Sequence, residues 1–244
     1  MRIRVINPNT TARMTALIES TARAVAAPGT EISAMNPTFG APSIECHHDD
    51  VWAAAGVAEQ VRLGEADGAD AYVIACFGDP GLHAAREIAR GPVIGIAEAA
   101  FHAATLLATG FSVVTTLTRT CVIAEHLVLQ YGFERRCKGI HGTDIAVLEL
   151  EDPASDAYAR IRDAASAALQ RDRSGAIVLG CAGMADLCTR LQRELGVPVI
   201  DGVAAAVKLA ESLVALGLGT SKRGDYAPPL AKDYAGLASP YSPS

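Results

Sequence analysis

Two stretches of this sequence match each other and decide the fold. Residues 71–82 read AYVIACFGDPGL, and residues 176–187 read AIVLGCAGMADL. In each stretch an apolar run typical of a buried strand ends at a cysteine, and small residues then lead into a helical pattern. The two cysteines, Cys76 and Cys181, stand at the same position of the two stretches. We therefore interpret the chain as a duplicated unit in which these cysteines are equivalent.

Short runs of strand character alternate with longer alanine-rich helical patterns, which is typical of parallel βαβ units. Strands are predicted at residues 3–6, 31–35, 71–75, 93–96, 111–115, 138–140, 176–179 and 197–200. Helices are predicted at residues 11–27, 49–66, 80–90, 98–109, 119–131, 153–171, 184–195 and 202–216. The order strand–helix, repeated four times, therefore occurs twice along the chain.

The predicted fold is α/β, with two similar Rossmann-like parallel-sheet domains related by a pseudo-twofold axis. The first half takes residues 1–97 and 208–244, and the second takes residues 98–207. Strands of βαβ units look alike in many proteins, so the strands alone leave the duplication open, and the matching cysteines favour it. Ligands of open parallel sheets bind outside the carboxyl ends of the strands. We therefore expect the active site in the cleft between the halves.

Composition and charge exclude several classes of partner. The chain of 244 residues has a formal net charge of −6 and no basic stripe that could meet phosphates. It has no apolar run of the ~18 residues needed to span a membrane and no secretory signal pattern. The six cysteines form no C-x-x-C pair, so free thiols are expected and a zinc site is not. These features predict a cytoplasmic protein without nucleic-acid or membrane partners.

The carboxyl ends of the central strands carry the candidate site residues. Short polar side chains follow the first and fifth strands, and cysteines follow the third and seventh. The residues at these ends are Asn7, Asn9, Cys76, Thr115, Thr116 and Cys181. Asn7, Asn9 and the two threonines are equally consistent with turn formation and with substrate binding.

Two thiols that face each other across a cleft can invert a stereocentre. One removes a proton from one side of a carbon, and the other returns a proton from the opposite side. A free thiol has a pKa of ~8.5, and a helix that opens at the cysteine is expected to lower it. The glycine-containing turns that follow, at Gly78 and Gly183, would let backbone N–H groups approach an enolate oxygen. This chemistry requires no cofactor.

Four segments together resemble the hydantoin/allantoin racemase branch of the aspartate/glutamate racemase superfamily. They are N-P-N-T-T from Asn7, C-F-G-D-P-G-L from Cys76, T-T-L-T-R from Thr115 and G-C-A-G-M from Gly180. The resemblance extends from residue 1 to about residue 229. It implies cofactor-independent racemisation of 5-substituted hydantoins or of allantoin, with Cys76 and Cys181 as the two bases.

The residues after each cysteine depart from those of the amino-acid racemases that this chain resembles in fold. Those enzymes place Thr-Asn or Thr-Glu there, which hold a charged amino acid. Here Phe77 and Gly78 follow the first cysteine, and Ala182 and Gly183 follow the second. A neutral ring held by backbone groups fits these residues better. In the family-like segment PSIE, Ile44 is expected to line the same pocket.

Two further segments have structural explanations. Asp79 precedes a proline and is expected to cap the helix predicted from residue 80. The run E-C-H-H-D-D at residues 45–50 contains metal-ligand residue types, but it is expected to be a solvated loop in which Asp49 or Asp50 caps the next helix.

Three functions remain open at this level. The first is a racemase acting on a small molecule, with assembly into a homo-oligomer. The second is a decarboxylase or cis–trans isomerase of the same superfamily that uses one cysteine. The third is a non-catalytic small-molecule binding protein, which the second cysteine argues against because binding has no need of matched thiols.

Overall fold

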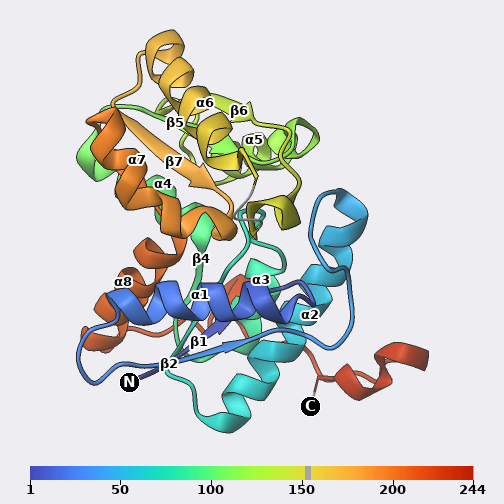
Figure 1. The fold of residues 1–244 in the computed structure, drawn as a ribbon. Coiled ribbons are helices and arrows are strands. Elements are labelled where there is room, and N and C mark those ends of the chain that lie inside the picture. The colour runs from blue at the N-terminus through green and yellow to red at the C-terminus, as the bar shows by residue number, and fades with distance from the viewer. Residues whose placement is uncertain (152–154, 244) are drawn as a thin grey trace.

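The structure, a computed structural model, describes residues 1–151 and 155–243 and consists of two lobes (Figure 1). The first contains the strands β1 (Arg2–Ile6), β2 (Glu31–Met35), β3 (Ala71–Ile74) and β4 (Val93–Gly95). The second contains β5 (Phe111–Thr115), β6 (Cys137–Gly142), β7 (Ala176–Gly180) and β8 (Val199–Ile200). The strand orders are β2-β1-β3-β4 and β6-β5-β7-β8, with all pairs parallel. The predicted fold of two similar parallel-sheet halves is confirmed.

The central strands are buried along their whole apolar length. Every residue of β3, β5 and β7 is buried, as are the last four residues of β1. The outer strands β2 and β6 are only partly buried. Continuous apolar runs suit strands whose two faces are both covered by helices. Cys76 and Cys181 each lie just after the carboxyl end of one of these buried central strands, β3 and β7.

The described residues also contain eight α-helices and five 3₁₀ turns, of which α8, η4 and η5 follow the last strand. The helices are α1 (Ala12–Val25), α2 (His47–Asp67), α3 (Leu82–Ile88), α4 (Ile96–Leu107), α5 (Cys121–Gln130), α6 (Ala157–Asp172), α7 (Cys188–Leu195) and α8 (Gly202–Ala215). The 3₁₀ turns are η1 (Thr118–Thr120), η2 (Val147–Glu151), η3 (Ala182–Leu187), η4 (Gly224–Tyr226) and η5 (Gly236–Tyr241). The helix start predicted at residue 153 lies outside the described residues.

Several predicted helix boundaries are wrong for local reasons. α3 begins at Leu82 rather than at Pro80, because Asp79 and Gly81 adopt φ values of 44° and 68°, which no right-handed helix contains. α2 begins at His47, so Cys46 takes the N-cap position and Asp50 lies within the first turn. The helix predicted over residues 184–195 is a 3₁₀ turn up to Leu187 and an α-helix only from Cys188.

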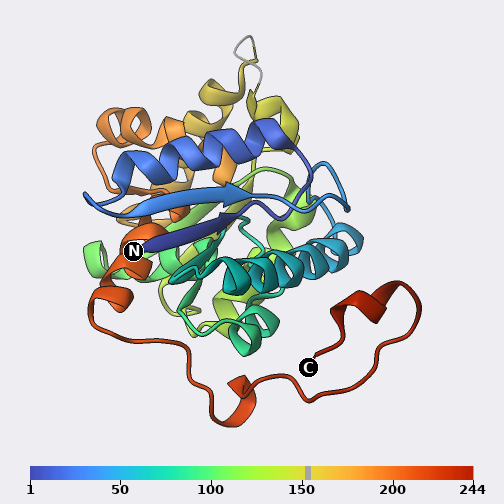
Figure 2. The same cartoon turned by 90° about the horizontal axis from the view of Figure 1, so that it is seen from below.

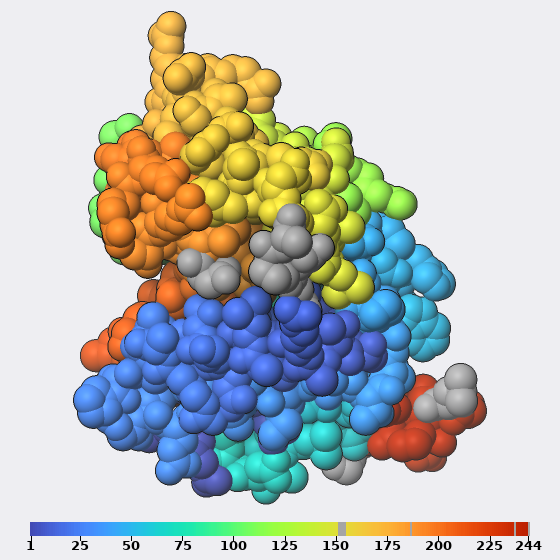
Figure 3. All heavy atoms as spheres, in the orientation of Figure 1, coloured from blue at the N-terminus to red at the C-terminus, as the bar shows by residue number. Residues whose placement is uncertain are grey.

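Two helices are exchanged between the lobes. α4 follows β4 of the first sheet but packs against β7 and β8 of the second. α8 follows β8 and packs against β3 and β4 of the first sheet, and α4 and α8 also pack on each other. The space-filling view shows the second lobe lying directly above the first (Figure 3). The division of the chain into residues 1–97 with 208–244 and residues 98–207 stays a proposal, and its second boundary falls inside α8.

An aromatic cluster on α4 joins the two halves. Phe101 is fully buried, and its ring centroid lies 5.7 Å from that of Phe77 and 5.2 Å from that of Phe111. Tyr131 and Phe133 contact the same ring edge-on. Phe77 directly follows Cys76, whereas Phe111 opens β5 of the second sheet. Phe101 therefore ties the loop that carries Cys76 to the core of the other half.

The C-terminal tail leaves α8 and runs outside the two lobes before it returns at its end (Figure 2). Lys222 Nζ donates to the carbonyl oxygens of Arg86 and Glu87, at 2.6 and 3.0 Å. Farther along, the Tyr241 hydroxyl donates to Glu59 Oε1 at 2.9 Å. These contacts fasten the tail to α2 and α3. None of the described helices is long and apolar enough to cross a membrane.

We predict that Phe101→Ala lowers the free energy of unfolding by about 3–5 kcal/mol, because it leaves a cavity at the centre of the aromatic cluster. Leu106→Ala on the same helix is the matched control, since Leu106 is 85% exposed, and it should change stability by no more than about 0.5 kcal/mol. Urea unfolding of the two variants checks this. Equal losses in both would contradict a cluster centred on Phe101.

Candidate active site

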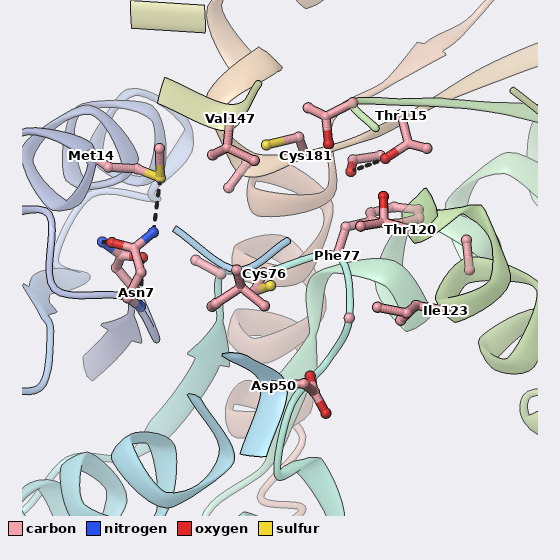
Figure 4. Close-up of a pocket in the computed structure, with 18 residues that line it drawn as sticks. Asn7, Met14, Asp50, Cys76, Phe77, Thr115, Thr120, Ile123, Val147 and Cys181 are labelled. Carbon is pink, nitrogen blue, oxygen red and sulfur yellow. Dashed lines mark hydrogen bonds between the residues drawn. The ribbon is translucent and has the colours of Figure 1, made fainter. Parts of the chain in front are cut away.

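Cys76 and Cys181 line one pocket between the two halves. Cys76 follows β3 and Cys181 follows β7, which occupy equivalent places in the two sheets. Both side chains are half-buried, and both are among the residues that line the pocket. Figure 4 shows the two sulfurs on opposite sides of it. The structure thus brings together two thiols that lie far apart in the sequence.

The backbone surroundings of the two thiols are alike. The N–H of Gly78 lowers the pKa of Cys76, and the N–H of Gly183 lowers the pKa of Cys181, each against the larger effect of burial. A Cβ atom on Gly78 would lie 3.9 Å from Cys76 Sγ, and one on Gly183 would lie 3.7 Å from Cys181 Sγ. The duplication seen in the sequence therefore extends to the environment of each sulfur.

Burial raises the pKa of both thiols above the ordinary range of a cysteine. It raises the pKa of Cys181 to about 11, against the opposing effect of the Gly183 N–H. The pKa of Cys76 is raised further, first by burial and then by the negative charges of Cys181, Asp50 and Asp79, while the Gly78 N–H opposes the shift. The sequence-based expectation of a lowered pKa is wrong. No α-helix begins at either cysteine, since α3 starts at Leu82 and only a 3₁₀ turn follows Cys181.

Most of the predicted substrate-binding residues lie in the pocket wall. The residues that line it together with the two cysteines are Asn7, Asn9, Ile44, Phe77, Gly78, Thr115, Thr116 and Ala182. Gly183 is not among the lining residues, and its N–H lowers the pKa of Cys181. The described residues contain no group of three His, Cys, Asp or Glu side chains arranged to hold a metal ion.

The two asparagines are largely occupied by the turn that contains them. Asn7 Nδ2 donates to Asn9 Oδ1 at 2.8 Å and to Thr15 Oγ1 at 3.0 Å. Asn9 Oδ1 also accepts from the N–H of Thr11 at 2.9 Å, and Asn9 Nδ2 donates to Met14 Sδ at 3.2 Å. These bonds make the turn rigid, so both side chains shape the pocket wall.

Thr115 has a comparable structural bond. Its Oγ1 donates to the carbonyl oxygen of Gly180 at 2.8 Å, which links the carboxyl ends of β5 and β7 directly before Cys181. A Cβ on Gly180 would lie 2.5 Å from Thr115 Cβ, so only glycine allows the two strand ends to approach this closely.

Sequence reasoning missed eight residues of the wall. They are Met14, Asp50, Ala75, Thr120, Ile123, Ala124, Val147 and Gly180. Ala75 and Gly180 directly precede the cysteines, and that position was a usable signal. Met14, Ile123 and Val147 come from helices and turns whose apolar residues are indistinguishable in sequence from ordinary core. Asp50 belongs to the segment that was interpreted as a solvated loop.

A hydrogen bond joins the two halves at the pocket wall. Glu45 Oε1, from the loop before α2, accepts from the N–H of Val147 in η2 at 3.0 Å. Val147 itself lines the pocket next to Cys181 (Figure 4). The loop of the first half is thus joined to a turn of the second at the pocket wall.

Asp79 caps a different helix from the one predicted. Its two carboxylate oxygens accept from the N–H groups of Ala97 and Glu98, both at 3.0 Å, at the start of α4. The Tyr131 hydroxyl donates to the same carboxylate at 2.9 Å. Gly95 is required here, because a Cβ on it would lie 2.2 Å from Asp79 Cγ. Asp79 therefore fastens the Cys76 loop to the exchanged helix, although burial raises its pKa to about 7.

Comparison with known proteins gives close matches over the whole chain. The family model described as Asp/Glu/Hydantoin racemase matches residues 3–210. A hydantoin racemase from Rhizobium meliloti is 50% identical, over 97% of this chain and 98% of its own. A hydantoin racemase from Pseudomonas sp. (strain NS671) is 48% identical, over 97% and 95%.

Solved structures agree with these matches. The structure of an allantoin racemase from Klebsiella pneumoniae is 59% identical and superposes with a TM-score of 0.98 over 100% of both chains. An allantoin racemase from Pseudomonas fluorescens is 43% identical, with a TM-score of 0.93 over 97% of this chain and 100% of its own. Arylmalonate decarboxylase, at 20% identity and a TM-score of 0.64, shares the fold alone.

We predict that Asp79→Asn removes part of the pH dependence of stability. The pKa of Asp79 is about 7 in the folded chain and about 3.9 in the unfolded chain, so the folded state binds more protons in between. The wild-type free energy of unfolding should therefore fall, relative to the variant, as pH rises from about 4 to about 7. Urea unfolding at four pH values checks this, and parallel curves would contradict it.

We also predict slow alkylation of the pocket thiols at neutral pH. The thiolate is the reactive form, and the pKa of Cys181 is about 11. Its reaction with iodoacetamide should therefore still accelerate about tenfold per pH unit at pH 9, where an ordinary thiol levels off. Mass spectrometry of the labelled peptide measures the rate. An alkylation rate that already reaches its plateau at pH 8 would show that the pKa of Cys181 is not raised.

Proposed function

This chain belongs to the Asp/Glu/hydantoin racemase family and is a racemase, and on that premise we propose that it inverts C5 of a 5-substituted hydantoin or of allantoin. The proton moves between the substrate and the thiols of Cys76 and Cys181, without a cofactor. The observation that carries the proposal is that both thiols line one pocket from opposite halves of the molecule.

Inversion needs an acid and a base at the same time, and the paired thiols supply both. When one thiol loses its proton, its negative charge makes ionisation of the other harder, as the effect of Cys181 on the pKa of Cys76 illustrates. Two such groups hold one proton between them over a range of pH. The thiolate removes the C5 proton from one face of the ring, and the remaining thiol delivers a proton to the other face.

The raised pKa values affect this reaction in two opposite ways, because they make each thiolate a stronger base but leave little of it at neutral pH. A hydrogen on carbon is a weak acid even beside a carbonyl, so a base with a high pKa removes it more readily once formed. The N–H groups of Gly78 and Gly183 lower the pKa of the two thiols and so favour the thiolate. Their approach to an enolate oxygen of the substrate, expected from the sequence, stays a prediction.

The pocket wall suits a small neutral ring. Its apolar side chains include Met14, Ile44, Phe77, Ile123 and Val147. Within the described residues, no Lys or Arg lines the pocket. A zwitterionic amino acid would bury its carboxylate here without a cation, which costs several kcal/mol, whereas a hydantoin ring carries no such charge.

Assembly into a homo-oligomer and a cytoplasmic location remain predictions from the sequence. Leu216 and Leu218, which follow α8, are 71% and 54% exposed. Exposed leucines close together in the chain are the kind of surface that assembly would bury.

We predict that Cys76→Ser and Cys181→Ser each reduce racemisation in both directions by about 10²–10⁴-fold, because serine is too weak an acid or base to replace a thiol. The remaining thiol still removes the proton on its own face and returns one from solvent. Each variant should therefore exchange deuterium into one enantiomer without inverting it, and the two variants should select opposite enantiomers. Proton NMR in D₂O with both enantiomers of the substrate measures this.

Cys188→Ser is the matched control, since the Cys188 thiol donates to the carbonyl of Val199 and does not line the pocket. It should racemise at the wild-type rate. Loss of carbon dioxide from a malonate-type substrate would favour a decarboxylase instead, and affinity without exchange would favour a binding protein. If both pocket variants exchange the same enantiomer, the two-thiol mechanism is wrong.

A further inference from the structure

Asp50 presents an unpaired carboxylate oxygen at the pocket. It lies in the first turn of α2 and is one of the residues that line the pocket. Its Oδ1 is buried and has no hydrogen-bond partner within residues 1–151 and 155–243. The only other buried side-chain atom in that part of the chain without a partner is the hydroxyl oxygen of Tyr158, which is not a pocket residue. A buried carboxylate oxygen that accepts no hydrogen bond costs free energy, so a ligand that donates a hydrogen bond to it would be favoured in this pocket.

The position of this oxygen places it beside the reacting groups. Around the point where a Cβ on Gly78 would lie, Asp50 Oδ1 is at 3.5 Å, Ile123 Cγ2 at 3.6 Å and Cys76 Sγ at 3.9 Å. Figure 4 shows the Asp50 side chain on the Cys76 side of the pocket, away from Cys181. A substrate whose C5 lies between the two sulfurs can therefore reach Asp50 with a group attached to its ring.

A carboxylate accepts hydrogen bonds and donates none, which restricts the group it can meet. A hydantoin ring carries two N–H groups, the imide N–H between its two carbonyl groups and the N1–H beside C5, and they point in different directions, so each offers a carboxylate a single hydrogen bond. A ureido substituent presents two N–H groups on one edge, with its carbonyl oxygen on the opposite edge. That edge matches a carboxylate, whereas an alkyl or aryl substituent offers no donor.

We propose that Asp50 selects substrates in which the hydantoin ring carries a ureido group at C5, by accepting hydrogen bonds from its two N–H groups. This inference rests on the proposed racemase function and names the substrate class of the same pocket. Since the Asp50 charge also disfavours ionisation of Cys76, donors bound to the carboxylate spread that charge and ease formation of the thiolate. Recognition of the ureido group and activation of the base are then linked.

The test compares two substrates of nearly identical shape. Allantoin carries the ureido group, and 5-isobutylhydantoin has carbon atoms in place of its nitrogen and oxygen atoms. Enantiopure samples of each are given to the wild-type chain and to Asp50→Asn, and kcat and KM are measured by polarimetry after subtraction of the spontaneous rate.

Asp50→Asn should lower kcat/KM for allantoin by about 10–100-fold, the loss expected for a charge-assisted pair of hydrogen bonds. For 5-isobutylhydantoin the same variant should leave kcat/KM unchanged or raise it, because the charge that opposes ionisation of Cys76 is gone. The readout is therefore the ratio of kcat/KM for allantoin to kcat/KM for 5-isobutylhydantoin. A general loss of structure would lower both values and leave this ratio unchanged.

Asp49→Asn is the matched control. Asp49 lies in the same turn of α2, its Oδ2 accepts from the N–H of Glu45, and it does not line the pocket. It loses the same charge and should leave the ratio at the wild-type value.

An equal loss for both substrates in Asp50→Asn would overturn the assignment, while the racemase proposal would stand. If wild type inverts neither substrate, the proposed function itself fails. Should Asp50→Asn not fold, the wild-type KM values still decide the question. Allantoin should then bind at least about tenfold more tightly than its isobutyl counterpart, and equal or reversed KM values would overturn the proposal.

Discussion

The exchange of α4 and α8 between the two sheets is the packing on which the site depends. A pocket shared by two lobes keeps its geometry only if the lobes do not move relative to each other. Here each sheet is covered by a helix that starts from the other sheet, and the two helices also pack together. Asp79 adds a polar fastening, because it holds the N-terminus of α4 from the loop that carries Cys76. The position of one thiol is thereby set by the helix that packs behind the other.

The chemistry of the pocket follows from a balance between burial and backbone donors. Burial makes both thiols weak acids, and one N–H group at each sulfur partly offsets that effect. The result is a pair of groups that prefer to hold their protons and become strong bases when they lose them. Asp50 belongs to the same balance, since burial raises its pKa as well and its charge acts on Cys76. The two thiols and the Asp50 carboxyl thus share one small apolar pocket, where the charge of Asp50 opposes ionisation of Cys76.

Sequence patterns predicted the eight strands, their grouping into two halves and the place of both cysteines at strand ends. These features are local, or they repeat at a fixed register, so one chain suffices to show them. The predicted start of α3 was wrong because Asp79 adopts a positive φ and its carboxylate bonds to the N-terminus of α4, a helix that follows the next strand. The expected lowering of the thiol pKa was wrong for a related reason. The helical pattern after each cysteine was visible in the sequence, but the delay before α3 and the depth of burial were not.

The sequence by itself determined the alternation of strands and helices, the duplication and the place of the two cysteines that we propose move the proton. Periodicity reports whether a residue is buried, and it reports this for each segment separately. Only the tertiary structure decided which buried residues meet. It brought Met14, Ile123 and Val147 together around the two thiols and, among the described residues, left Asp50 Oδ1 beside them without a hydrogen-bond partner. Such contacts depend on how whole helices pack across the seam, where the free energy is spread over many small apolar contacts and no single residue carries the signal.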